Sequence, residues 1–229
     1  MFYIFHHLGL GDHIICNGMV RHFTDLMDEV TIFCHKHYEN NVKYMFRDDN
    51  RIKVIAEEQK NIEPFLSTVK DPIMRVGFER IPYYESIFHQ HKKTFDEIFY
   101  DLAGLDFNIR YNKFYIERDK NKEEQAFQKL NPNNEPYIYV HDDPSRGFAI
   151  DKSKYRKDLK IIINDFNFNL FEMRKILENA TEIHTMQSGM FDLCNSMYLD
   201  KPKIYVHKYV RNYSDFLLSK GINKIEVIQ

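Results

Sequence analysis

Short apolar runs alternate with segments of helical periodicity along this chain, and that alternation restricts the possible fold more than any other feature. Runs such as 2–5, 29–34 and 137–140 have the length of buried strands. Segments such as 94–103 and 188–197 repeat apolar residues every three or four positions, as amphipathic helices do. Strand–helix alternation favours parallel sheets with helices on both faces, so we expect an α/β fold.

A stretch rich in asparagine and proline, Asn131-Pro132-Asn133-Asn134-Glu135-Pro136, divides the alternating pattern into two series. The 229 residues are enough for two small domains. We therefore expect two Rossmann-like domains, residues 1–131 and 132–229, each with a mainly parallel sheet, facing a cleft between them.

Composition narrows the function classes. The 32 basic and 34 acidic residues nearly balance, which argues against a nucleic-acid binder. Cys16, Cys34 and Cys194 lack metal-site spacing, and His35 with His37 lacks supporting ligands, so we expect free thiols in a reducing compartment and no metal site. The start has no signal-peptide pattern, and no apolar run approaches the roughly 20 residues of a membrane span. These features predict a cytoplasmic protein.

The first strand is followed by a glycine turn and the start of a helix. Gly9 and Gly11 let the backbone turn sharply and approach a ligand, and Asp12 falls at or next to the expected helix N-cap. Apolar residues then continue with helical spacing through Phe23. The turn is neither a dinucleotide fingerprint, since no third glycine follows in register, nor a P-loop. Taken alone, the glycines could equally make only a tight turn.

Three segments resemble the heptosyltransferase-like glycosyltransferases with the GT-B fold. Residues 8–15, Leu-Gly-Leu-Gly-Asp-His-Ile-Ile, are similar to the small-Leu-Gly-Asp motif at that family's first strand–helix turn. Residues 183–193 occupy the place of its Asp-Ser/Thr-Gly-x-x-His-Leu donor loop. Residues 200–206, Asp-Lys-Pro-Lys-Ile-Tyr-Val, are similar to its Gly-Lys-Pro strand.

The resemblance implies specific roles. Asp12 would be the general base on the acceptor hydroxyl, and Ser188, Gly189 and Met190 would hold the diphosphate of a nucleotide-sugar. A helix N-terminus with small residues suits phosphate on physical grounds as well. Gln187 is a further donor-binding candidate, although the family has an acid at its position, and Asp192 stands where the family often has histidine. It also has no long C-terminal helix that would pack back on the first half.

A further segment, residues 141–148, follows the first strand of the second half. Arg146 suits a diphosphate, and His141 or Asp142 could contact the acceptor or a ribose. The alternative is a polar turn in which Arg146 pairs with an acid. Lys208, Tyr209 and Arg211, after a later strand, could hold the base or phosphate of the donor, or could equally form a surface turn.

On the first half, Gly9, Gly11 and His13 complete the expected acceptor side. The resemblance implies a glycosyltransferase that is inverting and metal-independent, with a nucleotide-sugar as substrate, no cofactor and a carbohydrate or glycan acceptor. The alternative is a non-catalytic nucleotide- or carbohydrate-binding module, which Gln187 favours. A nicotinamide-dependent oxidoreductase is disfavoured, because the third glycine is missing and no acid closes the second strand, where Phe33-Cys34-His35 stands.

Overall fold

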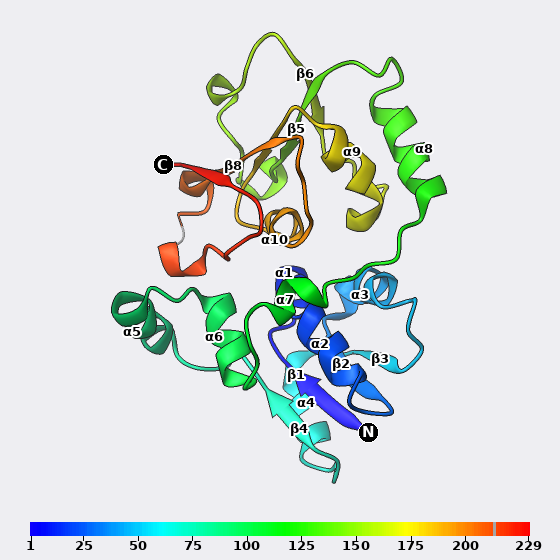
Figure 1. The fold of residues 1–229 in the computed structure, drawn as a ribbon, viewed down its shortest axis with the longest axis vertical. Coiled ribbons are helices and arrows are strands. Elements are labelled where there is room, and N and C mark those ends of the chain that lie inside the picture. The colour runs from blue at the N-terminus through cyan, green and yellow to red at the C-terminus, as the bar shows by residue number, and fades with distance from the viewer. Residues whose placement is uncertain (213) are drawn as a thin grey trace. The chain divides into compact units, whose positions relative to one another are not determined.

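The computed structural model describes residues 1–212 and 214–229 as two compact units. The first unit comprises Met1–Glu117 together with Asp215–Lys220. The second comprises Arg118–Ser214 together with Gly221–Gln229. Each unit is built around its own parallel sheet (Figure 1). The expected α/β class with two mainly parallel sheets is confirmed.

The first unit contains a four-stranded sheet in the order β3-β2-β1-β4, and all of its pairs are parallel. Every residue of β1 is buried, because β1 lies between β2 and β4 and is covered on both faces. The strands are β1 (Phe2–Phe5), β2 (Val30–Cys34), β3 (Ile52–Ala56) and β4 (Ile73–Arg75). The α-helices are α1 (Leu10–Ile15), α2 (Asn17–Thr24), α3 (Glu39–Met45), α4 (Gln59–Leu66), α5 (Ile81–His91), α6 (Phe95–Leu102) and α7 (Ile109–Asn112).

The helix expected after the first glycine turn is interrupted at Cys16, which separates α1 from α2. A buried tyrosine forms hydrogen bonds with the backbone groups at this break. The Tyr100 hydroxyl donates to the Ile15 carbonyl at 2.9 Å and accepts from the Met19 N–H at 3.2 Å. The interruption is therefore stabilised by a side chain from α6, which no local sequence pattern could reveal.

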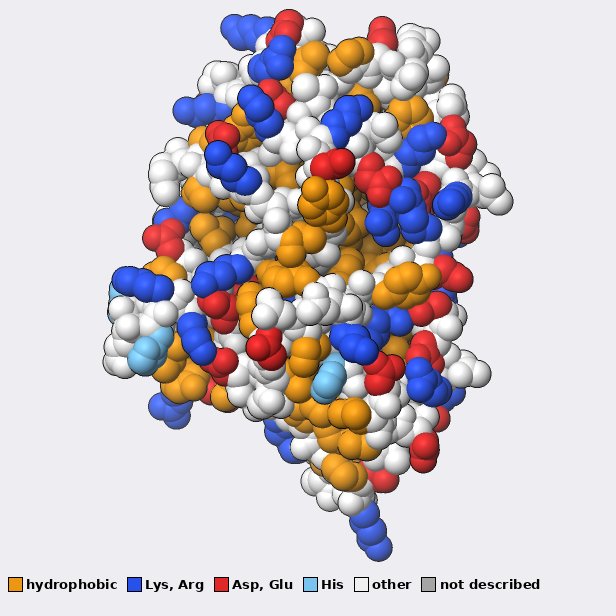
Figure 2. All heavy atoms as spheres, in the orientation of Figure 1, with side chains coloured by type: hydrophobic (Ala, Val, Ile, Leu, Met, Phe, Trp, Pro, Cys, Tyr) orange, Lys and Arg blue, Asp and Glu red, His pale blue; other side chains and the backbone are white. Residues whose placement is uncertain are grey.

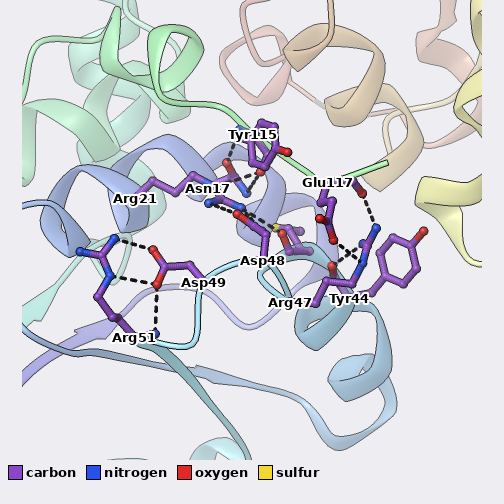
Figure 3. Close-up of polar contacts among 10 residues, drawn as sticks. Asn17, Arg21, Tyr44, Arg47, Asp48, Asp49, Arg51, Tyr115 and Glu117 are labelled. Carbon is purple, nitrogen blue, oxygen red and sulfur yellow. Dashed lines mark hydrogen bonds and ion pairs between the residues drawn. The ribbon is translucent and has the colours of Figure 1, made fainter. Parts of the chain in front are cut away.

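A polar network fixes the end of the long N-terminal segment of the first unit (Figure 3). The Asn17 side chain donates to the Tyr115 carbonyl at 3.2 Å and accepts from the Tyr115 N–H at 3.0 Å. Arg21 donates to the same carbonyl at 2.9 Å, and Arg47 forms an ion pair with Glu117 at 3.3 Å. The backbone is thus anchored up to the residue at which the chain passes into the second unit.

The second unit contains a five-stranded sheet in the order β6-β5-β7-β8-β9, and all of its pairs are parallel. The central strands are almost wholly buried: β5 is nearly continuously apolar, whereas β7 buries the polar side chains of Glu182, His184 and Thr185. The elements are α8 (Lys120–Leu130), β5 (Tyr137–His141), β6 (Lys160–Ile163), α9 (Arg174–Asn179), β7 (Glu182–Thr185), α10 (Gly189–Ser196), β8 (Lys203–His207) and β9 (Ile225–Ile228). The connection from β5 to β6 contains only two short 3-10 helices, at Pro144–Arg146 and Lys152–Lys154.

A short C-terminal segment completes the core of the first unit. Phe216 is buried and stacks on Tyr84 of α5 with ring centroids 6.5 Å apart. The Lys220 N–H donates to the buried Asp96 carboxylate at 3.1 Å. The Lys220 carbonyl accepts a hydrogen bond from the Tyr111 hydroxyl at 2.8 Å. Six residues, 215–220, therefore pack on this unit although they lie almost one hundred residues after Glu117.

The surface carries both signs of charge. Figure 2 shows basic and acidic side chains interspersed over the face in view, as the near-equal numbers of the two types lead one to expect. Within the described part of the chain, no helix combines the length and apolar character needed to cross a bilayer.

Candidate functional site

The first candidate region lies at the point in the first sheet where the order of strand addition reverses. From β1 the chain adds β2 and β3 on one side and then returns to the other side of β1 to add β4. Open α/β sheets bind ligands at the carboxyl ends of the strands that flank such a reversal. The loops after β1 and β4 meet here, and the Val76 N–H donates to the Phe5 carbonyl at 3.0 Å.

The turn after β1 places the Asp12 carboxylate directly over Gly9. Helix α1 begins at Leu10 with Gly9 as its N-cap, so Gly11 and Asp12 are the second and third helical residues. The expectation that Asp12 lies at or next to the N-cap is therefore wrong by two positions. A Cβ atom on Gly9 would lie 2.7 Å from Asp12 Oδ2. Gly9 is thus needed for the approach of the carboxylate, and Asp12 keeps 21% of its side chain exposed.

Asp12 has a histidine partner from the end of β1. His7 Nδ1 lies 3.7 Å from Asp12 Oδ1. Burial lowers the pKa of His7, but the hydrogen bond and charge of Asp12, with smaller contributions from the Gly77 backbone and Glu79, more than offset it and raise the pKa above the usual value. The pair therefore favours an imidazolium beside a carboxylate.

His13 lies inside the unit rather than at its surface. Its ring is buried and packs edge-on against His6, with centroids 4.5 Å apart. Burial, with the charges of His6 and His35, lowers the pKa of His13 well below the usual value. His6 Nδ1 lies 2.6 Å from the His7 carbonyl, which fixes that nitrogen as the donor. The two buried rings of His6 and His13 are therefore neutral and pack inside the unit next to the turn that carries Asp12.

The second candidate region is the equivalent reversal in the second sheet. From β5 the chain first adds β6 on one side and then returns to the other side for β7 and β8. The carboxyl ends of β5 and β7 are neighbours, with His141 paired in register with Thr185. Residues 142–148 and 186–188, which follow these strands, therefore lie at the position where such sheets bind ligands.

The loop after β7 ends in the N-cap of α10. Ser188 has an extended backbone, and its Oγ accepts from the Phe191 N–H at 3.5 Å and donates to the Met186 carbonyl at 3.1 Å. Gly189 and Met190 open the helix, and N–H groups in a first turn have no intrahelical acceptor. The Met190 side chain is buried in the core, so only its backbone could contact a ligand.

Two arginines flank one aromatic ring beside this loop. The Arg211 guanidinium donates to the Gln187 carbonyl at 2.9 Å and lies 5.1 Å from the Phe148 ring centroid. Arg146 lies 5.8 Å from the same centroid, but it forms an ion pair with Asp143 at 2.5 Å. This pairing is the polar-turn arrangement set out as the alternative for Arg146. Arg211, which follows β8, is bonded directly to the loop.

Three other candidates lie at the same edge of the sheet. His141 ends β5 and is largely buried, and burial lowers its pKa to about 4, partly offset by Asp143. The Asp142 carboxylate accepts from the Ile150 N–H at 3.0 Å, so it orders its own loop. Lys208 begins the 3-10 turn Lys208–Val210 directly after β8.

Sequence reasoning missed a buried polar chain that crosses β7 and β8. His184 Nε2 lies 3.3 Å from a Glu182 oxygen, and His184 Nδ1 lies 2.9 Å from His207 Nε2. A carboxylate only accepts, so His184 Nε2 carries the proton, and His207 Nε2 must then donate to His184 Nδ1. The available signal was the i, i+2 spacing of Glu182 and His184, which places both side chains on the same face of a strand.

The described residues hold no group of three or more histidine, cysteine, aspartate or glutamate side chains arranged to bind a metal ion. The positive groups near the second loop are instead the helix terminus and the two guanidinium groups already described.

The fold is shared with solved glycosyltransferase structures, whereas no family model and no curated protein matches the sequence. A glycosyl transferase family 9 protein from Veillonella parvula is similar with a TM-score of 0.59 at 9% identity, over 99% of this chain and 85% of that one. The ADP-heptose LPS heptosyltransferase II of E. coli gives 0.54 at 10% identity, over 99% and 89%. The E. coli heptosyltransferase WaaC, solved with ADP, gives 0.51 at 10% identity, over 100% and 93%. At these identities the likeness establishes the GT-B type of fold.

Proposed function

We propose that this protein is a glycosyltransferase that moves a sugar from a nucleotide-sugar to a hydroxyl acceptor, with inversion and without a metal requirement. One observation carries the proposal. In each of the two sheets, the loop that resembles a glycosyltransferase motif lies at the point where the strand order reverses. The structures with which this chain shares its fold include one solved with ADP, which supports a nucleotide as part of the ligand.

The second unit would bind the donor. The N–H groups of Gly189 and Met190 and the dipole of the eight-residue helix α10 offer positive charge to a diphosphate. Arg211 adds a guanidinium that is already oriented by the Gln187 carbonyl. Arg146 would contribute less, because a ligand must compete with Asp143 for it. These groups supply the charge that a divalent cation would otherwise provide.

The first unit would bind the acceptor and hold the base. Glycosyl transfer removes a proton from the acceptor hydroxyl as its oxygen bonds to the anomeric carbon, while the bond from that carbon to the diphosphate breaks. Asp12 is partly exposed and is fixed over Gly9 at the end of β1. It would take the proton, and the departing diphosphate would keep the bonding electrons.

Donor binding is the first test. Nucleoside diphosphates and nucleotide-sugars are titrated calorimetrically, with and without EDTA. Loss of one charge-assisted hydrogen bond costs about 1.5–3 kcal/mol, so Arg211→Ala should weaken diphosphate binding roughly tenfold or more. Arg156→Ala is the matched control, because Arg156 is exposed and pairs with Asp158 and Glu182 rather than with the loop. A wild-type protein that binds none of these compounds would rule out the proposal.

Catalysis is the second test. Asp12→Asn should abolish transfer and leave donor binding unchanged, since the base and the proposed donor loop lie in different units. Unchanged turnover would remove Asp12 from the base role. Donor binding by the wild type without transfer or hydrolysis across an acceptor panel would favour a non-catalytic binding module, which Gln187 in place of the family acid also suggests.

We also propose that the protein works in carbohydrate biosynthesis in the cytoplasm. Its three cysteines are free and buried, and burial raises the pKa of each thiol. Such thiols suit a reducing compartment. Fractionation of the native host cell would test this location.

A further inference from the structure

The His7 imidazole is held in one orientation by groups from two segments, the loop after β4 and helix α6. The edges of Phe78 and Phe99 contact it with ring centroids 5.4 and 5.5 Å away. Gly77 lies against the ring with a φ of +93°, and a Cβ there would approach His7 Cδ2 to 3.3 Å and Phe99 to 2.8 Å. Glycine at position 77 therefore permits the close approach that fixes the ring.

The two oxygens of Asp12 have different surroundings. Oδ1 faces His7 Nδ1 at 3.7 Å, and Oδ2 lies over Gly9, where a Cβ atom would come within 2.7 Å. His7 thus engages one carboxylate oxygen and leaves the other above a residue that has no side chain. Since Asp12 is partly exposed, a hydroxyl group could reach Oδ2.

The charged groups around His7 act mainly in one direction. Asp12 from α1 and Glu79 from the loop after β4 both favour the imidazolium form, as does a hydrogen bond with the Gly77 backbone. The neighbouring His6 carries little opposing charge, because burial lowers its pKa. A proton on His7 is therefore retained below a raised pKa and lost as the pH rises through it.

We infer that His7 is a positioning residue that orients the Asp12 carboxylate and directs its Oδ2 toward the acceptor hydroxyl. This role rests on the proposed glycosyl transfer. The acceptor proton would pass to Oδ2, the acceptor oxygen would bond to the anomeric carbon, and the bond to the diphosphate would break with its electrons on the leaving group. Loss of the His7 proton would release the carboxylate, so transfer should decline at alkaline pH.

The first experiment needs no substrate. The titration of His7 is followed by NMR in the full-length protein, with its signals assigned from His7→Gln. His7 should titrate above the ordinary histidine range of about 6.5, and Asp12→Asn should lower its pKa measurably. The exposed His91, assigned from His91→Gln, should not respond to Asp12→Asn. An unchanged His7 titration in Asp12→Asn would overturn the inference, whatever reaction the protein catalyses.

The second experiment uses a donor and acceptor pair on which the wild type is active. In His7→Gln, kcat should fall at least tenfold while the donor KM stays within about twofold, and the alkaline decline of kcat/KM should disappear. His91→Gln should keep the wild-type profile. A His7→Gln profile that matches the wild type would refute the positioning role while leaving glycosyl transfer intact. An inactive wild type would instead count against the proposed function, and the NMR titration would still decide whether the pair exists.

Discussion

The buried chain Glu182–His184–His207 predicts that the second unit loses stability in mild acid. His207 is wholly buried, and burial, with the charge of His184, lowers its pKa to about 4. An unfolded chain would bind a proton at about 6.5. Between these two values the unfolded state binds more protons than the folded state, so the free energy of unfolding must fall as the pH decreases.

The size of this effect follows from the two pKa values. One histidine with a pKa of about 4 when folded and about 6.5 when unfolded costs about 2.5 kcal/mol of stability between about pH 7 and pH 4.5. The informative variant is His207→Gln. A glutamine amide can still donate to His184 Nδ1, but it does not titrate.

The assay is urea denaturation of both proteins across that pH range, with hydrogen exchange of the β8 amides as a local measure of the second unit. The wild type should lose about 2.5 kcal/mol more than His207→Gln between the two pH limits, because titrating groups distant from His207 contribute equally in the two proteins. Equal losses in the two proteins would refute the argument that His207 is held neutral by burial and by His184.

Three further substitutions test the packing of the first unit, each by denaturation. Gly18→Ala should destabilise the protein by about 1–3 kcal/mol, because the new Cβ would lie 2.4 Å from the Ile109 carbonyl oxygen. A variant as stable as the wild type would show that α2 and α7 can separate at no cost. Arg110→Met should cost about 3–5 kcal/mol by leaving the buried Asp96 carboxyl without its ion-pair partner, and a neutral result would contradict that pairing. Phe216→Ala should cost about 3–5 kcal/mol and open residues 215–220 to proteases, whereas unaltered protease resistance would show that the ring does not hold the segment.

Local patterns in the sequence predicted much of the fold. The strand and helix alternation identified both parallel sheets, because a buried parallel strand needs a continuous apolar run and a glycine or polar turn at its end. Ser188 was predicted near the start of a helix, and the structure makes it the N-cap of α10. Such features depend on residues only a few positions apart.

The features that escaped prediction depend on residues far apart in the chain. The helix break at Cys16 is stabilised by Tyr100, whose hydroxyl donates to the carbonyl of Ile15, 85 residues earlier in the chain. The hydrogen bond from Arg211 to Gln187 joins the ends of two strands, and it puts a different arginine beside the loop than the one favoured from sequence. Neither contact leaves a periodic signal in the sequence.

The return of residues 215–220 to the first unit has a consequence for how this protein can be made and divided. Phe216 fills a place in the core of a unit whose other residues end at Glu117. A ribosome must therefore synthesise almost one hundred residues of the second unit before the first can close its core. A fragment that ends at Glu117 would expose the Tyr84 ring, so the first unit depends on a segment that is made only after most of the second.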